Sequence, residues 1–400
     1  MNSNVPTLHS SVPQGASARA RVDSPTTNMH AHLRIRFAIA MAGALAACEH
    51  TAPFRPGAYG ASGPLNPGVV ARLTFNLGQD LTPAWVPGTN AIVYTAERMD
   101  RADRDRCLAF MPGTGGAITR YVCGTSTPDE SLNVYGETAV SSDGHIAYVR
   151  ASNTRALFRI GPDAQQLDVG PLANPTDARV VHIVPLTTAW GRTYDAVSYL
   201  GWLSAHRLVM IGDSVRYPRS CGSCPADTVR TGIEIVTVDF ADTGLGTLTL
   251  VPGTDSATSV TPGATGDTIY FTRAGDSGIH RYAFSTGQAS VAFDFGPGRL
   301  VRDVTVASGR LVAIVDGRVA DGGDLHVVNL ATTADSIVAQ PASGGPLWFA
   351  RPALAPDGRQ VVAQARVLTI TPIFDPATGI LLRVDTTAAG GNDLWAVQLP

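Results

Sequence analysis

Short apolar runs, alternating with polar positions or rich in β-branched residues, fill the chain from about residue 69 onward, and Pro, Gly, Asp and Asn separate them. Residues 81–94 and 350–363 are the clearest copies of one pattern: a short strand, a Pro-Gly or Pro-Asp-Gly turn, and a β-branched strand. Asp-Gly between two short apolar runs is a strong hairpin signal. No stretch has the period of an amphipathic helix of ten or more residues. The pattern therefore predicts an all-β fold.

The pattern recurs in six units. Their second strands are expected to begin near residues 92, 146, 208, 269, 312 and 361, a spacing of about 43 to 62 residues. A third strand is expected in each unit, at residues 107–110, 157–160, 233–236, 279–282, 325–328 and 394–397, and a fourth closes most units. Four strands in about 45 residues is typical of a β-propeller blade. The chain is therefore predicted to form a six-bladed β-propeller.

The two ends of this repeat array are complementary. The last unit ends at Pro400 without its own fourth strand, and a spare strand at residues 69–75 precedes the first unit. Pairing the spare strand with the last blade would close the ring and remove two exposed sheet edges.

An apolar run from Phe37 to Ala47 follows two basic residues, Arg34 and Arg36, and ends at Cys48. A basic segment, about eleven apolar residues and small residues before a cleavage site are typical of an export signal. A membrane-spanning helix needs roughly 20 apolar residues, so the run is too short to be one. Residues 45–48 (Leu-Ala-Ala-Cys) resemble a bacterial lipobox, in which the cysteine is lipidated and becomes the new N-terminus.

This resemblance implies an exported protein that is anchored by lipid at Cys48. We expect a leader and lipoprotein signal peptide at residues 1–47, a flexible linker at 48–68, and the propeller at 69–400. Translation from Met29 would place the basic residues at the N-terminus. Glu49 is not the Asp associated with inner-membrane retention, so we expect the outer membrane, on its periplasmic or surface side.

Composition excludes several function classes. The chain has 30 basic and 33 acidic residues, a balance that gives no sign of a nucleic-acid partner. Every basic residue is Arg, because the sequence contains no Lys. A Walker A motif, a Schiff-base lysine, a Ser-Lys dyad and a pyridoxal-phosphate site are therefore excluded.

The turn motifs resemble the TolB-like propeller repeat of bacterial envelope proteins. They are Pro-x-Trp-x-Pro-Gly at residues 83–88, Ser-Asp-Gly at 142–144 and Pro-Asp-Gly at 356–358, with Ser/Thr-x-Arg-like segments at 95–98 and 272–273. The resemblance covers residues 69–400 and implies a propeller that binds other molecules. The separate N-terminal α/β domain of TolB has no counterpart after Cys48. The role of TolB in its own complex is therefore not carried over.

Besides Cys48 the chain has four cysteines, which allow three pairings. In the predicted blade, Cys107 opens the third strand and Cys123 follows the fourth, and antiparallel neighbours bring such positions within disulfide reach. Cys221 and Cys224 form a C-x-x-C in a long insertion of the third unit. A structural clip is expected there, because a redox motif would begin a helix; the redox role is the alternative.

Motifs of catalysis and metal binding are weak. Gly-Asp-Ser-Gly at residues 275–278 matches a protease nucleophile segment, but it falls in an expected hairpin turn. The acidic residues of 100–105 alternate with Arg, which favours a salt-bridged loop over a calcium site. We therefore assign no catalytic residue, metal ligand or cofactor. Trp85, Trp202, Trp348 and Trp395 are interpreted as core residues.

Long insertions are the candidate binding surface, because function tends to lie on loops over a rigid scaffold. They are residues 98–106, residues 171–196 between units two and three, the insertion around Cys221, and residues 368–392, which are expected to form a projecting hairpin. The candidate residues are Arg98, Arg101, Arg104, Trp190, Tyr194, Phe374 and Arg383. The leading hypothesis is a lipid-anchored, non-enzymatic propeller that binds an envelope protein, a peptide or a glycan. The alternative is a propeller hydrolase or lactonase-type enzyme with a metal site at the channel mouth.

Overall fold

The computed structural model describes residues 70–75, 78–97, 106–123, 131–153, 164–183, 191–217, 229–316, 323–339, 347–376 and 378–400. The elements of these residues are the strands β1 to β24 and one 3₁₀ helix, η2 (Pro175–Asp177). They form six antiparallel sheets of four strands each. The predicted all-β fold is confirmed.

Each sheet is one blade of a propeller. Blade 1 contains β2 (Asp80–Val86), β3 (Ala91–Glu97), β4 (Arg106–Pro112) and β5 (Arg120–Val122), and blade 2 contains β6 (Ser131–Val140), β7 (His145–Asn153), β8 (Ala164–Pro171) and β9 (Arg179–Ile183). Blade 3 contains β10 (Gly191–Ser204), β11 (Arg207–Tyr217), β12 (Val229–Asp239) and β13 (Thr247–Leu250), and blade 4 contains β14 (Ala257–Pro262), β15 (Thr268–Arg273), β16 (Gly278–Ala283) and β17 (Gln288–Asp294). Blade 5 contains β18 (Leu300–Ala307), β19 (Arg310–Asp316), β20 (Asp324–Asn329) and β21 (Asp335–Ala339), and blade 6 contains β22 (Leu347–Leu354), β23 (Gln360–Phe374), β24 (Leu381–Gln398) and β1 (Val70–Arg72).

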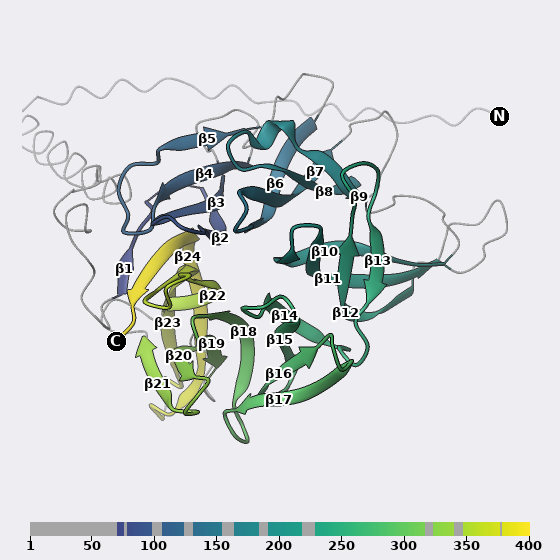
Figure 1. Ribbon diagram of the computed structural model, residues 1–400. Coiled ribbons are helices and arrows are strands. Elements are labelled where there is room, and N and C mark those ends of the chain that lie inside the picture. The colour runs from purple at the N-terminus through teal and green to yellow at the C-terminus, as the bar shows by residue number, and fades with distance from the viewer. Residues whose placement is uncertain are drawn as a thin grey trace, which may run out of the picture. The chain divides into compact units, whose positions relative to one another are not determined.

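The blades form a closed ring (Figure 1). The first strand of each blade contacts the first strand of the next, and β22 of blade 6 contacts β2 of blade 1. The predicted closure is present: β1 pairs antiparallel with β24, with Val70 opposite Val397. Beyond this pairing, Leu73 N–H donates to the Leu394 carbonyl at 2.7 Å, and Arg72 forms an ion pair with Asp393 at 2.7 Å. The chain is therefore a six-bladed β-propeller.

Blade 2 differs from the prediction. Its third strand is β8 (Ala164–Pro171), whereas residues 157–160, where it was expected, lie outside the described residues. The pattern of β8 explains the difference, since Leu167 and Val169 alternate with polar residues and are buried. The expected insertion between units two and three, residues 171–196, contains β9 and the beginning of β10 and is in large part blade structure.

The hydrophobic core lies between neighbouring blades. One cluster joins Trp85 and Tyr94 of blade 1 to Val362 and Leu394 of blade 6. The Trp85 indole N–H donates to the Ala353 carbonyl of blade 6 at 2.9 Å, so the prediction that Trp85 is a core residue is correct. A buried indole normally finds such a partner.

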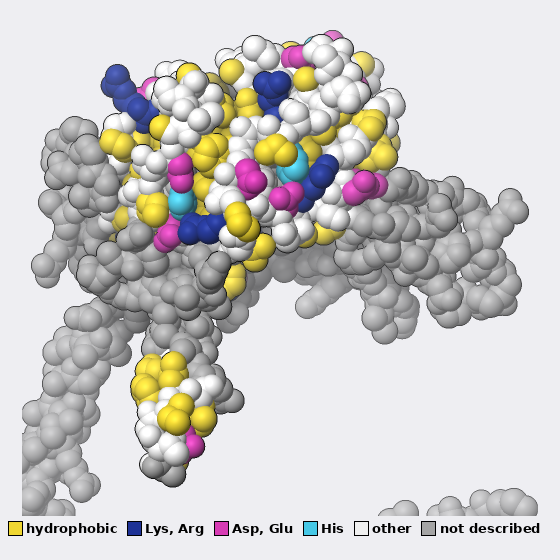
Figure 2. Space-filling model, turned by 90° about the horizontal axis from the view of Figure 1, so that it is seen from below, with side chains coloured by type: hydrophobic (Ala, Val, Ile, Leu, Met, Phe, Trp, Pro, Cys, Tyr) yellow, Lys and Arg dark blue, Asp and Glu magenta, His cyan; other side chains and the backbone are white. Residues whose placement is uncertain are grey.

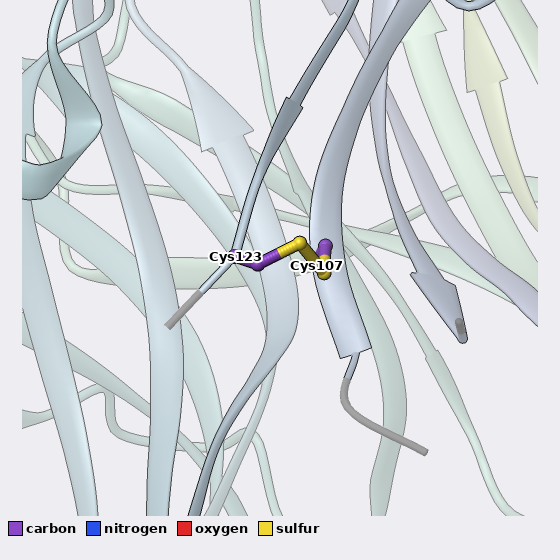
Figure 3. The surroundings of a disulfide bond; sticks show 2 residues. All are labelled: Cys107 and Cys123. Atoms are coloured by element: carbon purple, nitrogen blue, oxygen red, sulfur yellow. A yellow bond between two sulfur atoms is a disulfide. The ribbon is translucent and has the colours of Figure 1, made fainter. Parts of the chain in front are cut away.

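The predicted disulfide is present (Figure 3). Cys107 on β4 and Cys123, directly after β5, have Cα atoms 4.4 Å apart and bonded sulfurs. The predictions for Cys48, Cys221 and Cys224 fall outside the described residues.

The antiparallel order gives the ring two distinct faces. The turns between the first and second strands of all blades lie on one face, which we call the turn face. Connections from second to third strands, and from one blade to the next, lie on the opposite loop face. The Pro-Gly and Asp-Gly motifs form the turns, and Gly88, Gly144 and Gly358 have the left-handed φ of +74°, +84° and +71° that these turns require.

His182 on β9 predicts a loss of stability in acid. Its ring is buried, its Nε2 has no hydrogen-bond partner among the described residues, and burial lowers its pKa to about 4. The unfolded chain therefore takes up the proton first, so stability is complete above pH 6.5 and falls as the pH drops toward 4, by up to about 3 kcal/mol. Urea unfolding between pH 7 and pH 4 measures this loss. His182→Leu should lose less stability over the same range; an equal loss would contradict the assignment.

Candidate functional site

A β-bulge interrupts the innermost strand of every blade. At each bulge the inner strand has one residue more than its partner. One bulge of each strand lies at residues 82–83, 136–137, 199–200, 258, 302 or 351–352. Strands β6 and β10 have further register shifts, at residue 132 and at residues 195–196 and 203. An extra residue re-aims the neighbouring side chains, and here it turns polar groups toward the axis of the ring.

Three bulge residues have a backbone conformation that side chains disfavour. Thr82, Tyr199 and Arg351, on blades 1, 3 and 6, have φ of +49°, +56° and +52°. A non-glycine residue in this region costs of order 1–3 kcal/mol and persists only where its surroundings hold it. Such residues cluster at functional or strongly determined positions, and Tyr199 and Arg351 contact each other near the axis.

Arg351 is the centre of a polar cluster at the axis. Its Nη2 lies 3.0 Å from Glu137 Oε1 and its Nη1 lies 3.3 Å from Glu137 Oε2, the two-pronged geometry of a strong ion pair. The guanidinium carbon lies 3.4 Å from the centroid of the Tyr199 ring. Three blades thus meet through one cation.

Asp303 of blade 5 completes the cluster. It accepts hydrogen bonds from the Tyr199 hydroxyl and, at 3.2 Å, from the Arg351 backbone N–H. Burial and the charge of Asp303 raise the pKa of Tyr199 well above 10. Burial acts to lower the pKa of Arg351, but Glu137, Tyr199 and Asp303 together raise it. Tyr199 therefore stays protonated and Arg351 stays charged.

A cavity of about 420 Å³ occupies the turn-face half of the channel. It extends from Glu137, Tyr199 and Arg351 to the turn residues Ser308 and Pro356. Threonine hydroxyls, prolines and the two tryptophans of blades 1 and 3 line its walls, and all six innermost strands contribute. Its size is within the range of small-molecule pockets, and the Arg351–Glu137 pair lies at its end away from the turns.

The loop face exposes an aromatic–cation pair beside the channel. Trp348, near the beginning of β22, is 45% exposed. The Arg302 guanidinium of blade 5 lies 5.0 Å from its ring centroid and donates to the Phe349 carbonyl at 3.3 Å. The interpretation of Trp348 as a core residue is therefore wrong. Leu347 and Phe349 on either side are buried, so strand alternation turns Trp348 outward.

The predicted projecting hairpin is present on blade 6. Strands β23 and β24 stay paired from Val367 opposite Ala389 to Phe374 opposite Leu381, beyond the end of β22. Phe374 is 53% exposed, and Ile380, Leu381 and Leu382 are exposed to a similar degree. We call these four residues the hairpin tip.

The other predicted binding residues have mixed outcomes. Tyr194 lies on β10 and Arg383 on β24, where Arg383 pairs in register with Ile373, but neither side chain is described. Arg98, Arg101, Arg104 and Trp190 lie outside the described residues. Residues 98–105 join β3 to β4 and residues 184–190 join β9 to β10, so both connect strand ends on the loop face.

Sequence reasoning missed the axial cluster. Two carboxylates, Glu137 and Asp303, converge on the axis, although neither was predicted as a site residue. Both are occupied by Arg351 and Tyr199. The only local signal is the break in alternation at Tyr135–Thr138 and Ala350–Ala353, which marks the bulges. In the described part of the chain, no three His, Cys, Asp or Glu residues are grouped to hold a metal ion.

No protein-family model and no curated protein sequence matches the chain. Solved structures do resemble it in fold. TolB from Acinetobacter baumannii has 14% sequence identity and a TM-score of 0.48, and the match covers 78% of this chain and 65% of that one. The chain thus spans slightly less than two thirds of that TolB. The six-bladed architecture that the resemblance to TolB propellers implied is present in the structure itself.

Two enzymes are also similar in fold. The gluconolactonase XC5397 from Xanthomonas campestris has 13% identity and a TM-score of 0.47, covering 84% of this chain and 98% of the enzyme. An oligogalacturonate lyase in complex with manganese has 12% identity and a TM-score of 0.44, covering 83% and 93%. Identities this low describe the architecture alone. Among the described residues, no helix is long and apolar enough to span a membrane.

Proposed function

We propose that this chain is a lipid-anchored, non-enzymatic scaffold of the bacterial envelope that binds a protein or peptide at its loop face. The exposed pair of Trp348 and Arg302 carries the proposal. Trp and Arg are the residue types most enriched at interface hot spots. The Arg302 guanidinium covers one face of the Trp348 ring. The ring is still 45% exposed, so a partner can bury its free edge.

The axial cluster agrees with a binding role. The two carboxylates that a metal-dependent propeller enzyme would need at its channel are here held by Arg351 and Tyr199. Because Arg351 stays charged and Tyr199 stays protonated, neither group takes part in proton transfer near neutral pH. The cluster therefore joins blades 2, 3, 5 and 6.

Capture from envelope extracts tests the partner site. We expect residues 49–400, purified without lipid, to retain a partner that Trp348→Ala loses at least tenfold, since hot-spot truncations cost about 2 kcal/mol or more. Val291→Ala on β17 is the matched control, because Val291 is also strongly exposed but lies on an outer strand. Equal capture by the Trp348 and wild-type proteins would contradict this site.

Fractionation of cells tests the anchor. The full chain is expected in the membrane fraction, and Cys48→Ala should move it out of that fraction, because the acyl chains could no longer be attached. Metabolic labelling with a radioactive fatty acid provides the second readout. A labelled or membrane-bound Cys48→Ala protein would contradict lipidation at this residue.

A further inference from the structure

The hairpin tip is an apolar surface that stands apart from the propeller. Figure 2 shows a mainly hydrophobic group of side chains separated from the body of the ring. Phe374, Ile380, Leu381 and Leu382 are 53%, 64%, 50% and 61% exposed. β23 continues for residues 368–374 past its last pairing with β22, roughly 23 Å at the rise of a strand.

The end of the hairpin is a fixed turn. Asp375 N–H donates to the Ile380 carbonyl at 2.8 Å, and Gly379 N–H donates to the Asp375 carbonyl at 2.8 Å. Gly379 has φ +68°, which a larger side chain would disfavour. The Asp375 carboxylate accepts from Thr378 N–H at 3.2 Å, so the one acidic group of the turn is bound within it. These hydrogen bonds close the turn between Phe374 and Ile380.

The size of the tip argues against a second copy as its partner. At about half to two thirds exposed, each of the four side chains offers roughly 100 Å². Two tips in contact would bury roughly 800 Å², less than the roughly 1,200 Å² of a specific, stable interface. A convex apolar tip also needs a surface that can deform around it. The interface of a lipid bilayer does so, whereas a folded protein would need a matching groove.

The segment between Cys48 and β1 is long enough to let the tip reach a membrane. Residues 49–69 separate Cys48 from the first residue of β1 and reach roughly 70 Å when extended. β1 begins opposite Val397, which pairs with Val361 near the turn face. From Val361 to Phe374 is roughly 43 Å along β23. The linker is therefore long enough for a lipid on Cys48 and the tip to share one bilayer.

We infer that the hairpin tip inserts into the interface of a lipid membrane, as a second contact beside the lipid anchor. The insertion rests on the proposed function only for the reach of the anchor. The experiment below tests the insertion on a protein that lacks the lipid anchor. Insertion is driven by the apolar side chains, so salt has little effect on it.

Vesicle flotation of residues 49–400, which lack the anchor cysteine, tests the inference. We expect the protein to float with phosphatidylcholine vesicles, with or without phosphatidylglycerol, in low and in 1 M salt. Leu381→Asp should reduce the floated fraction at least tenfold, and Val291→Asp, an equally exposed control on β17, should leave it unchanged. Phe374→Trp should float and show a blue shift of its added fluorescence.

Three results would overturn the inference: no flotation of the wild-type chain, release by salt, or equal flotation of Leu381→Asp. If the wild-type chain does not float, and Leu381→Asp instead loses a captured envelope protein, the tip is a protein contact. Membrane fractionation of Cys48→Ala and capture by Trp348→Ala report on the proposed function separately.

Discussion

Arg351→Met is expected to destabilise the propeller by about 3 kcal/mol. The substitution keeps the aliphatic stem but removes the guanidinium, which leaves Glu137 without its cation at the axis. Both side chains are largely buried, at 22% and 16% exposed, and removing one partner of such a pair costs about 3–5 kcal/mol. Urea unfolding of the purified propeller at pH 7 measures the change.

A double-mutant cycle separates the ion pair from the packing of the side chain. Glu137→Gln should recover part of the stability lost in Arg351→Met, because the double variant no longer buries an unpaired carboxylate. Arg351→Lys is the charge-conserving control, and it should be less destabilising than Arg351→Met. If Arg351→Met and the wild type unfold at the same midpoint urea concentration, the cluster does not hold the blades together.

Deletion of residues 1–74 is expected to open the ring. It removes β1, the ion pair of Arg72 with Asp393 and the side chain of Leu73, which is 2% exposed. Losing a buried Leu alone costs about 2–5 kcal/mol. The melting temperature should therefore fall by at least about 3 °C. The freed edge of β24 should also pair with other chains, so light scattering should detect dimers or larger species.

Deletion of residues 1–69 is the matched control. It leaves β1 and its pairing with β24 complete, and it should melt at the temperature of the longer chain and stay monodisperse. Leu73→Ala provides a milder variant, should the larger deletion fail to fold. If the two deletions behave alike, the pairing of β1 with β24 is not what closes the propeller.

The fold could be predicted because its main signals are local. Each blade repeats a short strand, a turn with Pro-Gly or Asp-Gly, and a second strand, and Gly88, Gly144 and Gly358 hold the left-handed turn position. The spare strand before the first unit and the missing fourth strand of the last unit predicted that the two ends pair and close the ring. Blade 2 was placed less well, because residues 157–160 form an apolar run as convincing in sequence as Ala164–Pro171.

The axial cluster could not be predicted because its members are distant in sequence. Glu137, Tyr199, Asp303 and Arg351 come from four blades, and bulges decide which of their side chains face the axis. One extra residue reverses the inside and outside of a strand. Trp348 was misplaced for a related reason: its size suggested core, but its buried neighbours on both sides turn it toward solvent.

The bulges let the lining of the cavity vary independently of the strand pairing of the blades. A bulge residue lies outside the regular ladder of its strand, so its side chain can be exchanged while the register on either side is kept. Bulge residues of four blades line one cavity: Thr82, Glu137, Tyr199 and Arg351. The lining of the cavity can therefore change in evolution without any change in strand pairing, although each substitution there also alters the contacts between blades.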